Sequence, residues 1–468
     1  MNRREALQAI GGWGFALGLG LGLAGLASAS ARDRFAPTHP NILFLALDDL
    51  NDWVGCLGNH QARTPHIDAL AGRGVLFSNA HCATPACSPS RAAVMTGRAP
   101  WTTGVYDNTQ ARDPRLPSIA TAFGRAGYTT GLAGKVYHGG VIPPGPPSVD
   151  FVGPGPNNSG TDPDPANHFR WGPMNAKTGV DEAVVAWAEG QLAVIKGREP
   201  WFLGVGLVRP HLSWFCPQRF FDLHPLNGIE LPEPGSLDDC PAIAREFALA
   251  HAFGVHIPDR QAWREAVRAY LACCSYADDC VGRIVQAAPS DTIIVLWSDN
   301  GMHLGEKEHC SKYTLWEPST HVPLVVSGPD IEPGVCKEAV SLLDLFPTLC
   351  DLAHVNPPPG LDGLSLEPLL HEPARKTNRV AVTCQLRGNF AARDARWRYI
   401  RYMNGSEELY DHQHDPGEYH NLAQDPAHTD VKQRLRARLP KHSAPDAARD
   451  KQNRRWERIK QKYPRVFP

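Results

Sequence analysis

The stretch NILFLALDDL, residues 41–50, decides the fold class, because an unbroken apolar run ends in two adjacent carboxylates. A continuous apolar run of this length is typical of a strand that is buried on both faces, as in the parallel sheet of an α/β protein. Asp48 and Asp49 would then lie at the carboxyl end of the strand, where open α/β sheets bind their ligands.

Two further stretches repeat this design. In DTIIVLWSDNG, residues 291–301, the apolar run ends in Asp299 and Asn300 before a glycine, and WFLGVGLVRPH, residues 201–211, ends in His211. Because the carboxyl ends of parallel strands meet at one edge of a sheet, we expect these polar residues to share one site with Asp48 and Asp49.

Helical patterns alternate with these strands. The apolar spacing and the terminal glycines or small residues predict helices in HIDALAGRG (66–74), LPSIATAFGRAG (116–127), REAVRAYLACCSYADDCVGRIVQAA (264–288) and LLDLFPTLCDLA (342–353). The alternation predicts an α/β fold with a large mixed, mostly parallel sheet flanked by helices. The Pro- and Gly-rich stretch 142–169 is expected to be a long surface loop and a pocket wall.

The pattern changes after residue 370. RVAVTCQL (379–386) and WRYIRYM (397–403) are strand-like, and a charged run follows them. These features predict a large domain over residues 37–375 and a smaller C-terminal α+β domain over residues 376–468, with an antiparallel sheet and a helical tail.

Composition excludes several classes of protein. Of the 468 residues, 21% are charged and 42% hydrophobic, and the formal net charge is −2, so the chain is an ordinary globular protein without the basic footprint of a nucleic-acid binder. Residues 1–31 combine Arg3, Arg4, a Gly-diluted apolar run and small residues, which predicts a twin-arginine-like export signal and a periplasmic or extracellular protein. An uncleaved anchor helix is the alternative, but we expect no stable membrane insertion.

The twelve cysteines show no repeated spacing, which argues against a disulfide framework and leaves one or two bridges open. Cys273, Cys274 and Cys280 lie in a helical stretch and are interpreted as small buried thiols rather than a metal cluster. Cys87, in PACSPSRAAVMTG (85–97), could by itself be a nucleophile, a metal ligand, half of a disulfide or a core residue.

The residues around Cys87 resemble a known signature. PACSPSRAAVMTG, followed by Arg98, is similar to the first signature of the type I sulfatases of the alkaline phosphatase superfamily, and GYTTGLAGKVYH (127–138) is similar to the second. One departure from the first signature is Ala86, where a branched or hydroxylic residue is usual. The resemblance extends from residue 41 to residue 423 and implies an alkaline phosphatase-like fold. Within the family, GKVYHGG, LVRPH and SDNGMHLGEKEHCSKYTLWEPSTHVPL most resemble the iduronate-2-sulfatase-like bacterial enzymes.

The resemblance implies that Cys87 is converted to formylglycine by a partner, either a formylglycine-generating enzyme or an anaerobic sulfatase-maturating enzyme, which reads Pro89 and Arg91. One hydroxyl of the hydrated aldehyde would attack sulfur, and the other would lose a proton as sulfate leaves. Carried over by motif, Arg91 would hold the diol, Lys135 would contact sulfate and the nucleophile, and His138 would be the base. His211 and Lys312 would bind the sulfate oxygens and help to protonate the leaving alcohol.

A sulfate ester carries negative charge, so its hydrolysis needs fixed cations and a hard metal ion. The oxygen donors Asp48, Asp49, Asp299 and Asn300 suit Ca²⁺ or Mg²⁺ better than Zn²⁺, and the resemblance favours Ca²⁺, with the modified Cys87 as a further ligand.

Each assignment has a structural alternative. Asp48 and Asp49 could cap a helix, Lys135 and His138 could be turn residues, and His211 and Lys312 rest on short matches. Other residues near the motifs are interpreted as structural supports: His321, Thr96 and Arg98. Three residues are candidate sugar contacts that could equally be core or surface positions: Trp214, Arg387 and Asn389.

The resulting prediction is a sulfuric ester hydrolase that acts on a sulfated sugar, from a glycosaminoglycan or an algal polysaccharide. One alternative is a phosphonate or phosphate ester hydrolase of the same superfamily. Another is a catalytically inactive sugar-binding relative, which would keep Cys87 unmodified. A zinc phosphatase is disfavoured, because its site would need a histidine-rich two-metal cluster.

Overall fold

The computed structural model describes residues 39–110, 112–139, 149–156, 171–174, 178–195, 197, 200–251, 259–449 and 461. The predicted export signal and most of the stretch 142–169 lie outside these residues. Among the described helices, none combines the length and the apolar character needed to cross a membrane.

An eight-stranded sheet forms the centre of the fold, with the strand order β12–β2–β11–β9–β1–β7–β4–β5. The strands are β1 (Ile42–Asp48), β2 (Val75–Phe77), β4 (Thr129–Gly134), β5 (Phe151–Val152), β7 (Trp201–Pro210), β9 (Ile293–Ser298), β11 (Leu324–Ser327) and β12 (Gly334–Cys336). Neighbouring strands are parallel except that β11 runs antiparallel to both β9 and β2. The predicted mixed, mostly parallel sheet is therefore confirmed.

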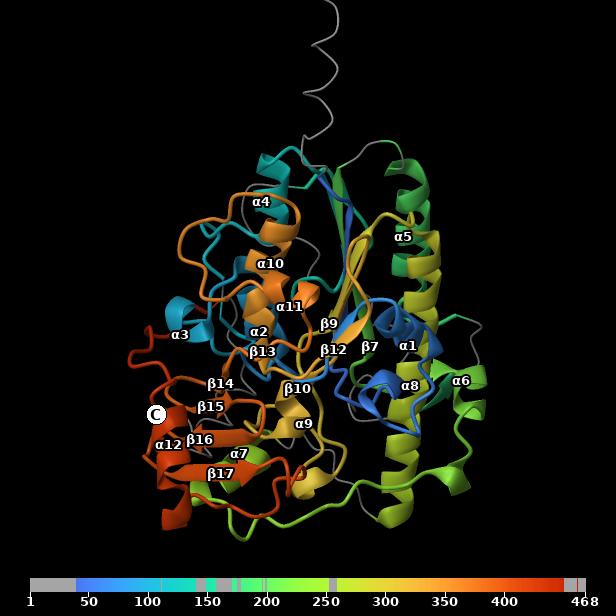
Figure 1. The fold of residues 1–468 in the computed structure, drawn as a ribbon. Coiled ribbons are helices and arrows are strands. Elements are labelled where there is room, and N and C mark those ends of the chain that lie inside the picture. The colour runs from blue at the N-terminus through green and yellow to red at the C-terminus, as the bar shows by residue number, and fades with distance from the viewer. Residues whose placement is uncertain are drawn as a thin grey trace, which may run out of the picture. The chain divides into compact units, whose positions relative to one another are not determined.

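Strand β1 is apolar throughout because both of its faces are covered. Leu43, Leu45 and Leu47 belong to the core on one face, with side chains of α1 (Pro65–Gly72), α5 (Glu182–Ile195) and α8 (Arg260–Ala287). The alternate residues of β1 belong to the core on the other face, under α2 (Cys87–Thr96), α4 (Ile119–Arg125) and α10 (Leu345–Leu352) (Figure 1). Each buried large apolar side chain contributes about 1.5–3 kcal/mol, so both layers stabilise the central strands.

The four predicted helices correspond to α1, α4, α8 and α10, the last of which is preceded by the 3₁₀ turn η5 (Leu342–Asp344). The expectation of a continuous loop over residues 142–169 is wrong at β5, which adds a short parallel edge strand beside β4. All twelve cysteines are free thiols, and Cys273, Cys274 and Cys280 are buried in α8 as predicted.

A separate four-stranded antiparallel sheet lies near the C-terminus and contains β14 (Ala381–Cys384), β15 (Phe390–Arg393), β16 (Trp397–Arg401) and β17 (Glu407–Asp411). The helix α12 (Thr429–Arg436) packs against β15 and β16. The sheet agrees with the predicted C-terminal α+β region, and the division of the chain at residues 375 and 376 stays a prediction.

Short elements complete the described chain. Two small sheets join β10 (His321–Val322), β3 (Ala80–His81) and β13 (Val340–Ser341), and β6 (Trp171–Met174) with β8 (Trp214–Pro217). The remaining helices are α3 (Pro100–Thr103), α6 (Gln218–Asp222), α7 (Ala242–His251), α9 (Glu317–Thr320) and α11 (Glu367–His371). Further 3₁₀ turns are η2 (Gly55–Leu57), η3 (Leu226–Gly228), η4 (Glu306–Glu308) and η6 (Pro426–His428).

Candidate active site

The carboxyl ends of β1, β9 and β7 bring the predicted acidic residues together. Leu47 of β1 pairs with Ser298 of β9, so the residues that follow these two strands meet at one edge of the sheet. Asp48 ends β1, and Asp49 turns the chain in the left-handed region with a φ of 63°. The backbone N–H of Asp49 donates to Oδ1 of Asp299 at 3.1 Å. Asp48, Asp49 and Asp299 are all at most 1% exposed.

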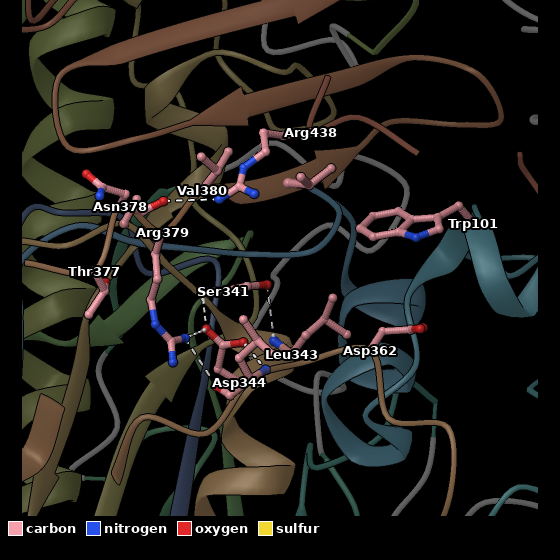
Figure 2. Close-up of a pocket in the computed structure, with 13 residues that line it drawn as sticks. Trp101, Ser341, Leu343, Asp344, Asp362, Thr377, Asn378, Arg379, Val380 and Arg438 are labelled. Carbon is pink, nitrogen blue, oxygen red and sulfur yellow. Dashed lines mark hydrogen bonds and ion pairs between the residues drawn. The ribbon is translucent and has the colours of Figure 1, made fainter. Parts of the chain in front are cut away.

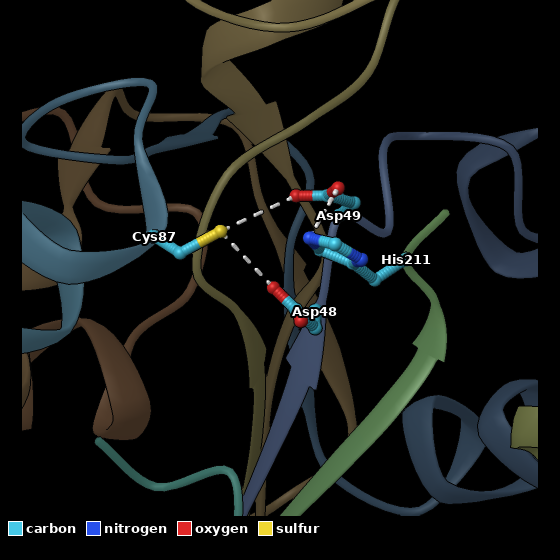
Figure 3. Close-up of side chains that lie close together, drawn as sticks. All are labelled: Asp48, Asp49, Cys87 and His211. Atoms are coloured by element: carbon cyan, nitrogen blue, oxygen red, sulfur yellow. Dashed lines mark hydrogen bonds and ion pairs between the residues drawn. The ribbon is translucent and has the colours of Figure 1, made fainter. Parts of the chain in front are cut away.

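Cys87 is the first residue of α2 and faces these carboxylates (Figure 3). Its Sγ lies 3.3 Å from Oδ1 of Asp48 and 3.8 Å from Oδ1 of Asp49. Burial and the neighbouring Asp48 charge raise the pKa of the Cys87 thiol well above its usual value. Because the thiolate is the nucleophilic form of cysteine, an unmodified Cys87 is a poor nucleophile in this setting.

Arg91 lies one helical turn after Cys87, on the same face of α2. Its Nε donates to Oδ2 of Asp299 at 2.7 Å, Nη2 donates to the Leu47 carbonyl at 2.9 Å, and Nη1 donates to the Lys135 carbonyl. Arg91 is fully buried, so its charge is balanced by the site and not by solvent. The guanidinium therefore ties the start of α2 to the ends of β1, β4 and β9.

Two buried lysines neutralise the paired aspartates. The ammonium of Lys135, just after β4, donates to Asp48, and Nζ of Lys312 lies 2.5 Å from Oδ1 of Asp49 and 2.8 Å from Sγ of Cys87. Although burial alone would lower the pKa of each lysine, the facing carboxylates raise it, so both stay charged. A close backbone approach places Lys135, because a Cβ on Gly206 of β7 would lie 2.1 Å from the Lys135 carbonyl carbon.

The two predicted histidines lie at the margin of the cluster. His211 follows β7; its Nδ1 donates to the Leu212 carbonyl at 2.5 Å, and its Nε2 is 3.8 Å from Oδ2 of Asp49. Burial and the Lys135 charge lower the pKa of His211 to about 4. His138 lies on an exposed turn after β4. Desolvation by the atoms around its ring and repulsion by Lys135 lower the pKa of His138 to about 3, although the residue as a whole remains exposed.

The donor atoms of the cluster fit a hard cation. Asn300 donates through Nδ2 to Oδ1 of Asp49 at 2.8 Å and to the Gly301 carbonyl at 2.9 Å, which leaves Oδ1 of Asn300 buried without a hydrogen-bond partner among the described residues. A buried amide oxygen beside two carboxylates is a donor set that suits Ca²⁺ or Mg²⁺. One ligand atom each from Asp48, Asp49, Cys87 and His211 also lies within 4.8 Å of the others. Asp299 lies beside these donors, where its oxygens accept from Arg91 and from the Asp49 backbone, and its role as a metal ligand stays a prediction.

Sequence reasoning missed Asn108, which braces the start of α2. Its Oδ1 accepts the Ser88 N–H at 2.9 Å, and its Nδ2 donates to Oη of Tyr313 at 3.1 Å. Tyr313 directly follows Lys312, so one side chain connects the segments that carry Cys87 and Lys312. The two partners lie 20 and 205 residues away in the chain, so no local spacing could have indicated this role.

The three residues interpreted as supports do support the fold. Thr96 donates to the Ala92 carbonyl within α2, and Arg98 donates to the Pro359 carbonyl at 2.7 Å. The ring of His321 lies 3.1 Å from the Ser78 carbonyl, to which its Nε2 donates.

Two of the three candidate sugar contacts are core positions in this structure. Trp214 is 1% exposed and Asn389 is fully buried, with its side-chain amide donating to the Gln385 carbonyl, and a contact of either with a sugar stays a prediction. Arg387 is exposed, beside Asp446 at 3.8 Å, and its role stays a prediction.

Comparison with known proteins decides the family. The sulfatase family model matches residues 40–355, and a model described as N-sulphoglucosamine sulphohydrolase, C-terminal, matches residues 305–444. The chain belongs to the sulfatase family. It is therefore a sulfuric ester hydrolase of the alkaline phosphatase superfamily, as the two signatures predicted.

Several curated sulfatases are similar along most of the chain. A sulfatase of Formosa agariphila is 33% identical, covering 86% of this chain and 87% of the relative. A choline-sulfatase of Rhizobium meliloti is 30% identical over 89% and 90% of the two chains, and the human iduronate 2-sulfatase is 30% identical over 68% and 70%. The crystal structure of a Bacteroides thetaiotaomicron protein assigned to the sulfatases superposes with a TM-score of 0.70 at 25% identity, covering 85% of this chain and 91% of that one.

Proposed function

We propose that this sulfatase removes sulfate from a sulfated sugar, using formylglycine made from Cys87 and a bound calcium ion. The observation that carries the proposal is the environment of Cys87: its Sγ faces Asp48 at 3.3 Å and the Lys312 ammonium at 2.8 Å. A side chain at this position meets anionic metal donors and a cation at once, as a nucleophile for an anionic ester requires. The similarity to iduronate 2-sulfatase supports a sugar substrate.

When present, hydrated formylglycine supplies a hydroxyl nucleophile, and calcium supplies positive charge beside it. The chain's own residues orient the side chain at position 87 and neutralise the negative charge of the sulfate. Arg91 fixes the turn of α2 that carries residue 87, while Lys135 and Lys312 supply two fixed charges for the sulfate oxygens. Because these charges are already held in place, they stabilise the developing negative charge without reorganisation.

The histidines would move protons. His211 lies 3.8 Å from Asp49, so its Nε2 borders the same space as the metal donors and the lysines. A low pKa keeps His211 neutral at pH 7, and substrate with its negative charge would raise that pKa toward the range of a proton donor. We assign to His138 the removal of the proton that accompanies sulfate release.

Export completes the proposal. The signal-like residues 1–31 predict a periplasmic or extracellular enzyme that takes part in polysaccharide degradation. A twin-arginine signal would let the folded protein receive its modification before export.

The test begins with the mass of the proteolytic peptide that contains Cys87, from protein produced with a formylglycine-generating enzyme. Conversion replaces the sulfur by oxygen and gives an aldehyde that a hydrazide labels, whereas a thiol at residue 87 would overturn the mechanism. The Cys87→Ala variant is the control.

Modified protein is then assayed on an iduronate 2-sulfate disaccharide, choline sulfate, 4-nitrophenyl sulfate and the matching phosphate and phosphonate esters. The highest kcat/KM on the sulfated sugar supports the proposal. Preference for choline sulfate would assign a small-molecule substrate, and faster cleavage of the phosphorus esters would favour the alternative hydrolase.

A further inference from the structure

A cavity with a volume of about 320 Å³ is lined by none of the predicted catalytic residues (Figure 2). Its walls come from α3, from the segment that contains η5, from residues 362–364 and from the start of the C-terminal sheet. We call it the α3 cavity. Its volume falls within the range of about 300–1,000 Å³ that is usual for small-ligand sites.

The α3 cavity shares no lining residue with the predicted catalytic cluster. Cys87 is the first residue of the ten-residue helix α2, which is about 15 Å long, and the cavity wall is attached at the other end of this helix. Asp362 fixes the cavity wall to that end, because its backbone N–H donates to the Gly97 carbonyl at 2.8 Å and its Oδ2 accepts the Ala99 N–H at 2.8 Å. The α3 cavity is thus a distinct, anchored site.

Two charged residues of the cavity, Arg379 and Asp344, form an ion pair with each other. Arg379 lies 3.1 Å from Oδ2 of Asp344 and also donates to the carbonyls of Leu364 and Ser365. Asp344 in turn accepts the backbone N–H groups of Ser341 and Leu364. These groups hold the floor of the cavity together and leave little capacity for a ligand.

Other polar groups are available. Among the described residues, no hydrogen bond is made by the indole N–H of Trp101, by Oδ1 of Asp362 or by the side-chain amide of Asn378. The guanidinium of Arg438 uses only Nη2, which donates to the Asn378 carbonyl at 3.1 Å. The cavity therefore offers one carboxylate acceptor and several donors around an aromatic ring.

The indole ring of Trp101 packs against Phe390 and gives the cavity a flat apolar wall. The two rings meet edge to face, with centroids 6.0 Å apart and planes at 73°. Leu364, which is 65% exposed, adds apolar surface to the rim. A ligand that matches these walls has apolar C–H faces and a polar edge that both donates and accepts hydrogen bonds, which is the chemistry of a sugar ring. An entirely apolar ligand would offer no partner to Oδ1 of Asp362 or to the remaining N–H groups of Arg438, and a free sulfate ion would face the Asp362 carboxylate.

We propose that the α3 cavity is a carbohydrate-binding site that holds one or two units of the sulfated polysaccharide on which the enzyme acts. The hydroxyls would bind Asp362, the ring would pack on Trp101, and an acidic group of the sugar would face Arg438. The choice of an acidic sugar rests on the proposed function, whereas the binding of a sugar rests on the cavity itself.

Binding is tested apart from turnover. The Cys87→Ala variant is passed over immobilised heparin, chondroitin sulfate and ulvan, and Trp101→Ala or Arg438→Ala is added to it. We expect each addition to weaken binding to the retaining polymer about fivefold or more. Trp101→Phe should keep most of the binding, and Arg436→Ala, which removes an exposed arginine of α12 that does not line the cavity, should leave it unchanged.

Activity provides the second readout. In active enzyme, Trp101→Ala should raise KM for the polymer with little change in kcat, and should leave hydrolysis of 4-nitrophenyl sulfate unchanged, which also shows that the variant is folded. Equal binding by all variants, or no retention on any of the three polymers, would overturn the proposal. If Trp101→Ala and Arg438→Ala weaken polymer binding but the active enzyme hydrolyses no sulfated sugar, the carbohydrate site is supported and the proposed function is refuted.

Discussion

Lys312 contacts two groups of the active site at once, Asp49 at 2.5 Å and Cys87 at 2.8 Å, and its side chain is 8% exposed. Replacement by alanine removes a charge that we propose faces the sulfate, and it leaves the buried carboxylate of Asp49 without its lysine partner. We therefore expect Lys312→Ala to lower kcat/KM about 100-fold or more and to cost about 3–5 kcal/mol of stability. Kinetics on 4-nitrophenyl sulfate and thermal unfolding measure the two effects.

Lys307 is a matched control for this prediction. It is also buried, but its ammonium lies over the rings of Trp316 and Tyr410, about 5.1 Å and 5.0 Å from their centroids, and away from the metal donors. Lys307→Ala should destabilise the protein and spare the kcat/KM of the folded fraction. Equal losses of kcat/KM in both variants would show that Lys312 acts through stability alone.

At the scale of helices, α8 holds the start of α1 through one carboxylate. Oδ1 of Asp278 accepts the N–H groups of His66 at 3.0 Å and Ile67 at 2.7 Å, and burial raises the pKa of Asp278 to about 6. The native state therefore binds this proton more tightly than the unfolded chain does. The resulting cost is absent below about pH 4 and reaches about 3 kcal/mol above about pH 6.

We accordingly expect Asp278→Asn, which keeps the Oδ1 acceptor, to flatten the fall in unfolding free energy between pH 4 and pH 6. Urea unfolding at a series of pH values measures the difference from the unchanged protein. Asp279→Asn is the control, because this neighbour is 39% exposed and lies 3.7 Å from Arg219. A curve for Asp278→Asn that stays parallel to the original would contradict the assigned pKa.

Over the whole molecule, local pattern predicted the central strands and helices, because β1, β7 and β9 are largely apolar runs with polar residues at or just after their carboxyl ends. It did not predict the antiparallel insertion of β11, whose four residues pair with β9 and β2 only in the folded chain. The signatures indicated Cys87 and Lys135, but the bracing by Asn108 depends on contacts between distant segments. The local sequence pattern thus predicts individual strands and motifs, whereas the neighbours of each strand and motif are decided by contacts between distant segments.

Because the proposed metal donors come from distant segments, metal binding should raise the free energy of unfolding of the whole fold. Asp48 ends β1, Asp49 follows it and Asn300 lies just after β9, so an ion bound to all three would join segments about 250 residues apart and would be lost on unfolding. At a calcium concentration of 100 times Kd, the gain is about 2.7 kcal/mol, which raises Tm by a few degrees. A chelator should reverse the rise, and Asn300→Ala, which removes the unpartnered buried oxygen, should reduce it by weakening the site. Scanning calorimetry with calcium, with magnesium and with chelator measures these shifts. A Tm that does not change when calcium is added, or a calcium-induced rise in Tm that is as large in Asn300→Ala as in the unchanged protein, would refute the assignment of this metal site.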